Sequence, residues 1–355
     1  MQDRGDVPTI LHNVGVFAYW TQRFIHKCAT TATGPRFAGQ ASAMDANAYS
    51  WLSGSARSWR TTELEQMGVS RRAITRLVER GILVRLQVNA YVPIKYWRSL
   101  TEAEQDRFRI TAHSRASHAL TQAAYSHTSA ARVHGLSLWD VDSRIHITQP
   151  LSGSSREHNA DVVRHRAKLL PGEVDMVDGL QVTSRARTVV DSARLLSYRQ
   201  GLITADHALH LGVQRAELHQ VLQRQAGYKG VQIAREVVEN ASVLSESAGE
   251  SLTAHLIAGM PIPQPEQQLV VRTRFGEHRI DFGWREQKLA LEFDGKTKYF
   301  DYAPTPEVLF QERRREKALM EQGWVFIRLE WADLFQEATR GRILKAWWNC
   351  ARSAA

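Results

Sequence analysis

The chain has 355 residues, which at roughly 100 to 200 residues per domain corresponds to two or three domains and excludes a single small module. Lys and Arg number 46 against 37 Asp and Glu, so the formal net charge is +9. A positive excess favours an anionic partner, and nucleic acid is the partner we expect. With 43% hydrophobic and 23% charged residues, the composition excludes a disordered chain.

The sequence has two cysteines, Cys28 and Cys350, and no CxxC pair. This excludes a disulfide framework and a cysteine-based zinc site, and it predicts a reducing, cytoplasmic location. No apolar run approaches the roughly 18 residues that a membrane span needs. The first residues also lack the basic start and apolar core of a signal peptide. We therefore expect no membrane association.

Residues 1–43 show no clear periodicity, and Met44 opens a segment typical of the start of a bacterial helical domain. We expect residues 1–43 to be an upstream extension or a poorly ordered arm; the alternative is a basic arm that reaches into a DNA groove. The composition and patterns divide the chain into this leader, a winged helix-turn-helix, a mixed α/β middle module and a C-terminal domain, at 1–43, 44–95, 96–240 and 241–355.

Residues 57–92 have the pattern of two short helices followed by a hairpin. The first helix is predicted at about 62–67 and ends at Gly68. Ser70 is a good N-cap for the second helix, which Gly81 ends. Two alternating segments then predict the wing of a winged helix-turn-helix, at 82–86 and 90–93.

The second of these helices has one apolar and one basic face. Ile74, Leu77 and Val78 share a face by their spacing, so the basic residues point outward. About eight basic residues stand against three acidic ones in 57–95, which favours DNA binding over the alternative of a solvated helix face. The predicted groove and phosphate contacts are Arg71, Arg72, Thr75, Arg76 and Arg85.

The middle segment has few residue patterns that predict a catalytic or binding site. RIHITQP predicts a strand, GLQVTSRARTVVDSAR predicts a strand and then a helix from about Ser184, and a helical pair follows. Its histidines have no carboxylates at metal-ligand spacing, so we expect surface or core histidines rather than a metal site. These histidines include His113, His118, His127 and His134.

The C-terminal segment carries the strongest chemical signal. Ile280, Phe282 and Trp284 alternate, and a second alternating run, 289–293, follows a polar break. A hairpin that turns between Glu286 and Gln287 pairs the two apolar faces and also places carboxylates opposite each other. In this register Phe282 lies opposite Leu291, and Asp281 lies opposite Glu292.

Opposed carboxylates repel each other unless a cation compensates. Mg²⁺ (or Mn²⁺) takes carboxylate oxygens, and it can bind a phosphate and lower the pKa of an attacking water. Asp281 and Glu292 are the expected ligands, Glu250 at a helix start can complete the shell, and Asp294 lies two residues beyond Glu292. Lys298 can orient the water or stabilise developing charge.

Glu250, Asp281, Glu292 and the cluster EFDGKTKY, followed by a basic helix and GWVFIRLEWADL, resemble the very-short-patch-repair-like branch of the PD-(D/E)xK endonuclease superfamily. The resemblance implies a restriction-endonuclease-like mixed sheet flanked by helices. It also implies that Asp281 and Glu292 are metal ligands, Glu250 the helix-borne acid and Lys298 the cationic member. In the superfamily a Lys follows the Glu by two residues, but Asp294 stands there. Either Lys298 or Lys296 replaces it, or activity is lost.

The helix predicted at 307–322 carries a basic run, 313–317, which is either a solvated face or a DNA-backbone contact. The half of the chain upstream of residue 241 resembles AbiEi-type antitoxin proteins of abortive-infection systems. That resemblance implies a winged helix and a cognate toxin or defence-system partner.

We therefore expect an α+β and α/β multidomain protein that is a Mg²⁺-dependent DNA endonuclease in bacterial phage defence or DNA repair. The alternative is an AbiEi-like antitoxin or transcriptional repressor whose nuclease-like domain is catalytically inactive. Cleavage of RNA or of a structured nucleic acid is a third, weaker hypothesis, because no aromatic platform for single strands is evident.

Overall fold

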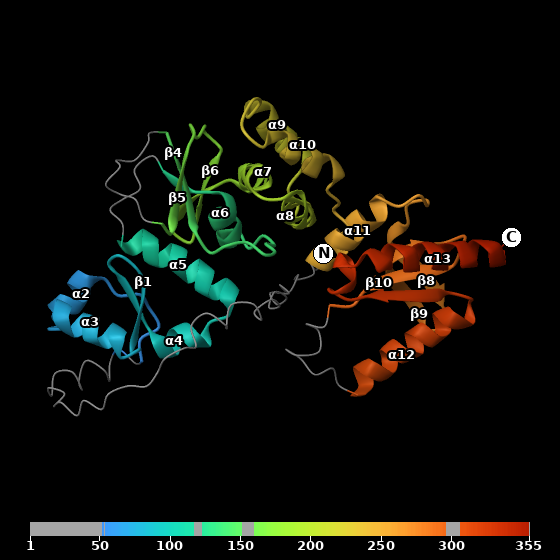
Figure 1. Cartoon of the computed structure of the whole chain (residues 1–355), viewed down its shortest axis with the longest axis horizontal. Helices are drawn as coiled ribbons and strands as arrows, with labels where there is room; N and C mark the ends of the chain where they lie inside the picture. The colour runs from blue at the N-terminus through green and yellow to red at the C-terminus, as the bar shows by residue number, and fades with distance from the viewer. Residues whose placement is uncertain (1–51, 53, 117–122, 151–159, 296–305, 355) are drawn as a thin grey trace, which may run out of the picture.

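The computed structural model describes residues 52, 54–116, 123–150, 160–295 and 306–354, and Figure 1 shows the path of the chain. It is a mixed α/β multidomain structure whose described residues form three sheets, of two, five and four strands. The predicted leader, 1–43, and Met44 lie outside the described residues. Within the described ranges, no helix has the length and apolar character needed to cross a bilayer.

The N-terminal region has the element order expected of a winged helix-turn-helix. Gly68 and Gly81 adopt φ values of +85° and +66°, and the Ser70 hydroxyl accepts a hydrogen bond from the Ala73 amide at 3.3 Å. These are the turn, stop and cap that the sequence predicts. The elements are α2 (Thr61–Gln66), α3 (Arg71–Glu79), β1 (Leu83–Gln87) and β2 (Ala90–Pro93).

The apolar face of α3 packs against α2 and β1. Ile74 and Leu77 are buried with Leu64 and Leu83 in one core, so the opposite face of α3 meets solvent. A second small core joins the hairpin to α4 (Ile94–Ser99) and α5 (Glu102–Ala116).

The middle region begins with a five-stranded sheet of order β5-β4-β3-β7-β6. The pairs β4·β5 and β3·β7 are parallel, and the other two pairs are antiparallel. Helix α6 (His127–Val133) follows the short strand β3 directly. The strands are β3 (Ala124–Tyr125), β4 (Ile145–Gln149), β5 (Val162–Arg166), β6 (Val174–Val177) and β7 (Leu180–Thr183).

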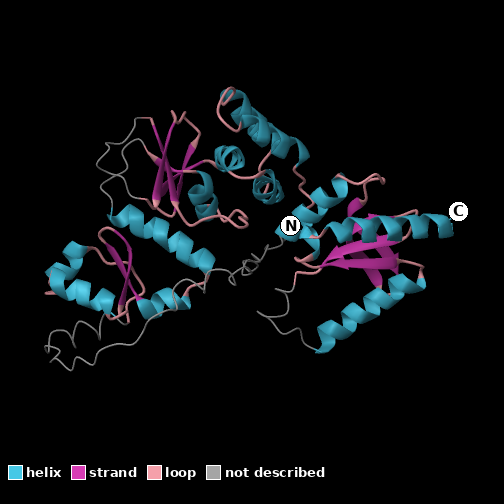
Figure 2. Ribbon diagram, in the orientation of Figure 1, coloured by secondary structure: helices cyan, strands magenta, loops and turns pink. Residues whose placement is uncertain are grey.

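Four helices complete the middle region and share one apolar core (Figure 2). Small residues allow the backbones of α7 and α8 to approach each other closely. A Cβ on Gly201 of α8 would lie 3.1 Å from the Ala193 Cα of α7. The predicted strand, Ser184-capped helix and helical pair are confirmed. The helices are α7 (Arg185–Leu195), α8 (Tyr198–His210), α9 (Arg215–Arg224) and α10 (Val231–Asn240).

Gly230, which precedes α10, allows a test of this packing. Its φ is +80°, and a Cβ there would lie 2.2 Å from the Arg194 carbonyl oxygen. Gly227 has a similar φ of +82° but nothing within 4 Å. We expect Gly227→Ala to lower the free energy of unfolding by about 1 to 2 kcal/mol, because of the left-handed backbone alone. Gly230→Ala should lower it by a further 1 to 3 kcal/mol, roughly, because the backbone must also shift. Urea denaturation of both variants measures the difference, and equal values would contradict the packing described.

The C-terminal region is a four-stranded mixed sheet of order β11-β10-β9-β8. Figure 1 shows α11 and α13 on one side of it and α12 on the other, and two separate cores line these two faces. Its elements are α11 (Ala248–Ala258), β8 (Glu266–Thr273), β9 (Gly276–Trp284), β10 (Leu289–Phe293), α12 (Pro306–Glu321), β11 (Val325–Leu329), the 3-10 turn η4 (Asp333–Phe335) and α13 (Glu337–Ala354).

The predicted register of the hairpin is confirmed where β9 and β10 pair. Phe282 lies opposite Leu291, and Trp284 lies opposite Leu289. Beyond the last pair, the Asp281 carboxylate accepts a hydrogen bond from the Phe293 amide at 2.9 Å. Strand β8, which pairs with the other edge of β9, was not predicted.

Candidate functional site

The five predicted DNA contacts lie on one helix and on the first strand of the wing. All five side chains are exposed, and the helix buries its other face. We call this set of side chains the α3 face. It comprises Arg71, Arg72, Thr75 and Arg76 on α3 and Arg85 on β1.

Members of the α3 face also have contacts within the protein. Arg71 Nε donates to a Glu65 carboxylate oxygen at 2.7 Å, and the Thr75 hydroxyl donates to the Arg71 carbonyl at 3.1 Å. Arg85 Nε donates to the Gln87 carbonyl at 3.4 Å. These contacts orient the side chains but leave them at the surface. In the described structure Arg72 is exposed without an ion pair, so its guanidinium is open to an external anion.

Other basic residues of this region have a structural role. Arg57, Arg60 and Arg115 lie 3.6, 3.7 and 3.2 Å from the Glu63 carboxylate, and Arg57 also stacks over Trp59. The local excess of positive charge is therefore partly neutralised at the start of α2. The five residues of the α3 face are among the basic and hydroxylated side chains of this region that remain exposed.

The structure brings together the acidic residues predicted to form the metal site. Glu250 lies in the first turn of α11, Asp281 on β9 and Glu292 on β10, and Asp294 follows β10. Burial raises the pKa of Glu250, and the negative charge of Asp281 adds to this shift. Lys298, and Lys296 as its alternative, lie outside the described residues.

Glu250 is held by hydrogen bonds from the protein itself. Its carboxylate accepts from the Glu246 amide at 3.0 Å, from the Ser247 hydroxyl at 2.8 Å and from Gln268 Nε2 at 2.9 Å. Gln268 reaches it from β8, where Gln268 has a φ of +53° and lies between the paired residues Gln267 and Leu269. Donors within the protein thus satisfy the carboxylate that was expected to complete a metal shell.

Glu292 lies between two arginines from neighbouring elements. Arg315 of α12 and Arg328 of β11 come within 3.8 and 3.6 Å of its carboxylate, and Arg328 also pairs with Glu316 at 3.0 Å. Burial raises the pKa of Glu292, and Arg315 opposes that shift. Positive charge beside Glu292 is thus supplied by two arginines. The assignment of Glu250, Asp281 and Glu292 as ligands of Mg²⁺ or Mn²⁺ stays a prediction.

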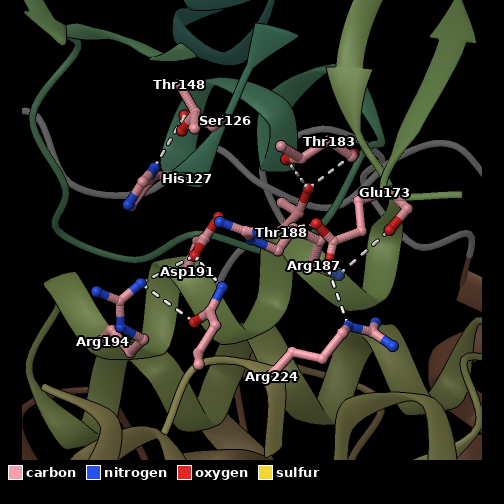
Figure 3. A network of polar contacts seen from close by, with 12 residues as sticks. Ser126, His127, Thr148, Glu173, Thr183, Arg187, Thr188, Asp191, Arg194 and Arg224 are labelled. Carbon is pink, nitrogen blue, oxygen red and sulfur yellow. Dashed lines mark hydrogen bonds and ion pairs between the residues drawn. The ribbon is translucent and has the colours of Figure 1, made fainter. Parts of the chain in front are cut away.

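A buried network of ionic contacts lies between α7 and the middle sheet (Figure 3). Arg187 Nη1 and Nε donate to Glu173 at 2.7 Å and to Asp191 at 2.8 Å, and all three side chains are nearly inaccessible to solvent. Arg194 and Arg224 pair with the same two acids at 3.1 and 3.2 Å. Sequence reasoning missed this network, although the spacing of Arg187 and Asp191 by four residues on a helix was a signal for the first pair.

Three histidines from separate elements also meet in the middle region. His127 and His146 are buried and His165 is half-buried, and the rings of His127 and His165 stack with centroids 3.7 Å apart. Burial lowers the pKa of His146 to about 4, and His165 adds to this shift. From sequence, His127 was expected to be a surface or core histidine, because no carboxylate lies at metal-ligand spacing from it; His146 and His165 are distant from it in the chain.

His113 gives the fold a dependence on pH. It is buried against Tyr125, 2.8 Å from the phenol oxygen, and burial lowers its pKa from 6.5 to about 4. Between these values the unfolded chain binds a proton that the folded chain does not, so stability falls as the pH drops from 6.5 towards 4. The difference corresponds to about 3 kcal/mol. Urea denaturation at pH 7 and pH 4.5 should show His113→Gln losing less stability than the wild type, and equal losses would contradict this account.

Two family models match this chain. The model described as "Transcriptional regulator, AbiEi antitoxin" matches residues 60–94, and the model described as "AbiEi antitoxin C-terminal domain" matches residues 120–240. The first range contains α2, α3 and the hairpin, and the second contains the five-stranded sheet and the four helices that follow it. Two segments of the chain are therefore similar to domains of the AbiEi antitoxin family.

Relatives in Mycobacterium tuberculosis include an uncharacterized protein, Rv2248 in strain H37Rv and MT2308 in strain CDC 1551. It is 30% identical to this chain over 166 residues, which are 46% of this chain and 60% of the relative. The crystal structure of the RV2827C protein from the same species is similar with a TM-score of 0.36 and 15% identity, covering 64% of this chain and 88% of that one.

These matches contradict the endonuclease function that the sequence analysis put first, and they agree with its alternative. Both matched ranges end before Glu250, and a very-short-patch-repair-like nuclease is not among the matched models. The physical reason for the error is that opposed carboxylates were taken to require a metal, whereas Arg315 and Arg328 lie beside Glu292.

Proposed function

We propose that this protein is a DNA-binding transcriptional regulator of the AbiEi antitoxin type, which binds DNA through the α3 face. The observation that carries the proposal is that the matched regulator segment, 60–94, contains a capped helix whose outward face holds the predicted DNA contacts. The helix supplies groove contacts through Arg72 and Arg76, and the wing supplies a phosphate contact through Arg85.

The expected site of action is DNA upstream of the chain's own gene, because an antitoxin that regulates transcription can control its own production. A reporter driven by that upstream DNA should be repressed in cells that make the wild-type chain. Equal reporter output with and without the chain, at matched protein levels, would contradict the proposal.

The C-terminal acidic residues have no part in this function. Glu292→Gln should therefore repress the reporter as the wild type does, although it removes the charge that faces Arg315 and Arg328. Loss of repression by this variant, with the protein still folded, would show that the C-terminal region takes part in DNA binding.

We further propose a cognate toxin as a protein partner. The support is the match of residues 120–240 to the AbiEi antitoxin C-terminal domain. Co-expression of the full chain with the product of an adjacent gene should relieve growth arrest caused by that product. The Arg72→Ala/Arg76→Ala variant should relieve it equally, because the α3 face lies outside the matched C-terminal domain.

A further inference from the structure

Three imidazoles converge at the edge of the middle sheet. One ring nitrogen from each of His127, His146 and His165 lies within 4.8 Å of the other two. The closest pair is His146 Nδ1 and His165 Nε2, 2.9 Å apart. We call this group the histidine triad.

The fold itself dictates this convergence. Strands β4 and β5 are parallel, with His146 opposite Val163 and His165 opposite Thr148, so the two histidines share one face of the sheet two positions apart. Strand β3 pairs with β4 on the other side, and the chain leaves β3 into α6, whose first residue is His127. Residues widely separated in sequence are thus brought to one point by strand pairing.

We propose that the histidine triad binds one divalent transition-metal ion of the zinc class. Imidazole nitrogen is a preferred ligand of Zn²⁺, Co²⁺, Ni²⁺ and Cu²⁺, whereas Mg²⁺ prefers oxygen. Three neutral histidines with a fourth position for water form a coordination set that zinc adopts in proteins. This inference is independent of the DNA-binding function.

A hydroxyl chain behind His127 is suited to support a ligand. Ser126 Oγ lies 2.9 Å from His127 Nδ1, and the Thr148 hydroxyl donates to Ser126 Oγ at 2.7 Å (Figure 3). Ser126 can accept from both groups. A proton on His127 Nδ1 then leaves the Nε2 lone pair for a metal, and an outer partner of this kind fixes the tautomer of a ligating histidine.

The spacing of the nitrogens is close to what a metal needs. Zinc–nitrogen bonds of about 2.0–2.1 Å in a tetrahedral site place two ligand nitrogens about 3.3 Å apart. The distance of 2.9 Å between His146 Nδ1 and His165 Nε2 is slightly shorter than this value. The limit of 4.8 Å, within which all three ligand nitrogens lie, is longer than it. Rotation of a ring out of the His127–His165 stack brings the third nitrogen within reach. Without a metal, the same rings are held by the stack and by the hydrogen bond.

The test uses the full chain, purified without a polyhistidine tag and stripped with a chelator. Zn²⁺ is titrated in competition with a chromophoric chelator, and Co²⁺ is titrated separately while its visible absorption is recorded. The wild type should bind one Zn²⁺ per chain, and the bound Zn²⁺ should raise the Tm of the protein. Bound Co²⁺ should give the intense visible absorption bands of a four- or five-coordinate site. His165→Gln should weaken Zn²⁺ binding by about tenfold or more. His165 is the best choice because it is only half-buried, so its loss disturbs the fold least.

The matched control is His219→Gln, which removes a partly exposed histidine of α9 outside the triad. It should bind Zn²⁺ as the wild type does. Equal weakening by the two variants, or wild-type affinity in His165→Gln, would overturn the proposal. If His165→Gln does not fold, anomalous scattering from wild-type crystals grown with Zn²⁺ decides: a peak among the three rings supports the site, and its absence overturns it.

Discussion

Arg187→Ala should lower the free energy of unfolding by about 3 to 5 kcal/mol, the range for removing one partner of a buried ion pair. The substitution leaves the Glu173 and Asp191 carboxylates buried, at 3% and 0% exposure, without the guanidinium that joins them. Arg194 and Arg224 remain beside these acids, but each pairs with one acid only. Urea denaturation followed by circular dichroism measures the change.

Arg144→Ala is the matched control, because it removes an arginine from an exposed pair. Arg144 and Asp142 are each 51% exposed, and an exposed pair contributes about 0 to 1 kcal/mol. A similar loss of stability in both variants would mean that the buried network does not stabilise the middle region in the way that its geometry indicates.

Arg72→Ala/Arg76→Ala should reduce affinity for operator DNA by about 10²-fold or more, since an arginine that reads a base contributes about 1 to 3 kcal/mol. Both side chains lie on the exposed side of α3, and neither supports the core beneath it. The fold of the variant should be intact. Fluorescence anisotropy at a fixed salt concentration measures the affinity.

Arg272→Ala/Arg274→Ala is the control for charge alone. It removes two exposed arginines from the β8–β9 hairpin, which lies in a different region of the molecule. If this control weakens DNA binding as much as the α3 variant does, the binding depends on net charge and not on the α3 face.

The sequence predicted the N-terminal region well because its signals are local. A cap at Ser70, a turn at Gly68 and a stop at Gly81 each depend on a few neighbouring residues, and all three were confirmed. The β9–β10 register was also predictable, since alternation on two strands joined by a short turn admits one pairing that buries both apolar faces.

The sequence failed where the contacts come from distant elements. Arg315 and Arg328 reach Glu292 from α12 and β11, so their contacts with this carboxylate have no local signal. The histidine triad depends on the order of strands in the middle sheet, which sequence patterns do not determine. Strand β8 was missed because its first residues are polar and its backbone is irregular at Gln268, where φ is positive.

The α3 face is expected to bind one DNA sequence in preference to others. The most direct measurement is the affinity of the wild-type chain for a duplex from its own upstream region and for a scrambled duplex of the same length, at one salt concentration. We expect the wild type to bind the upstream duplex about 10³-fold more tightly than the scrambled one, the lower limit for specific recognition. In Arg72→Ala/Arg76→Ala the difference in affinity between the two duplexes should be much smaller. Equal affinity of the wild type for both duplexes would contradict it.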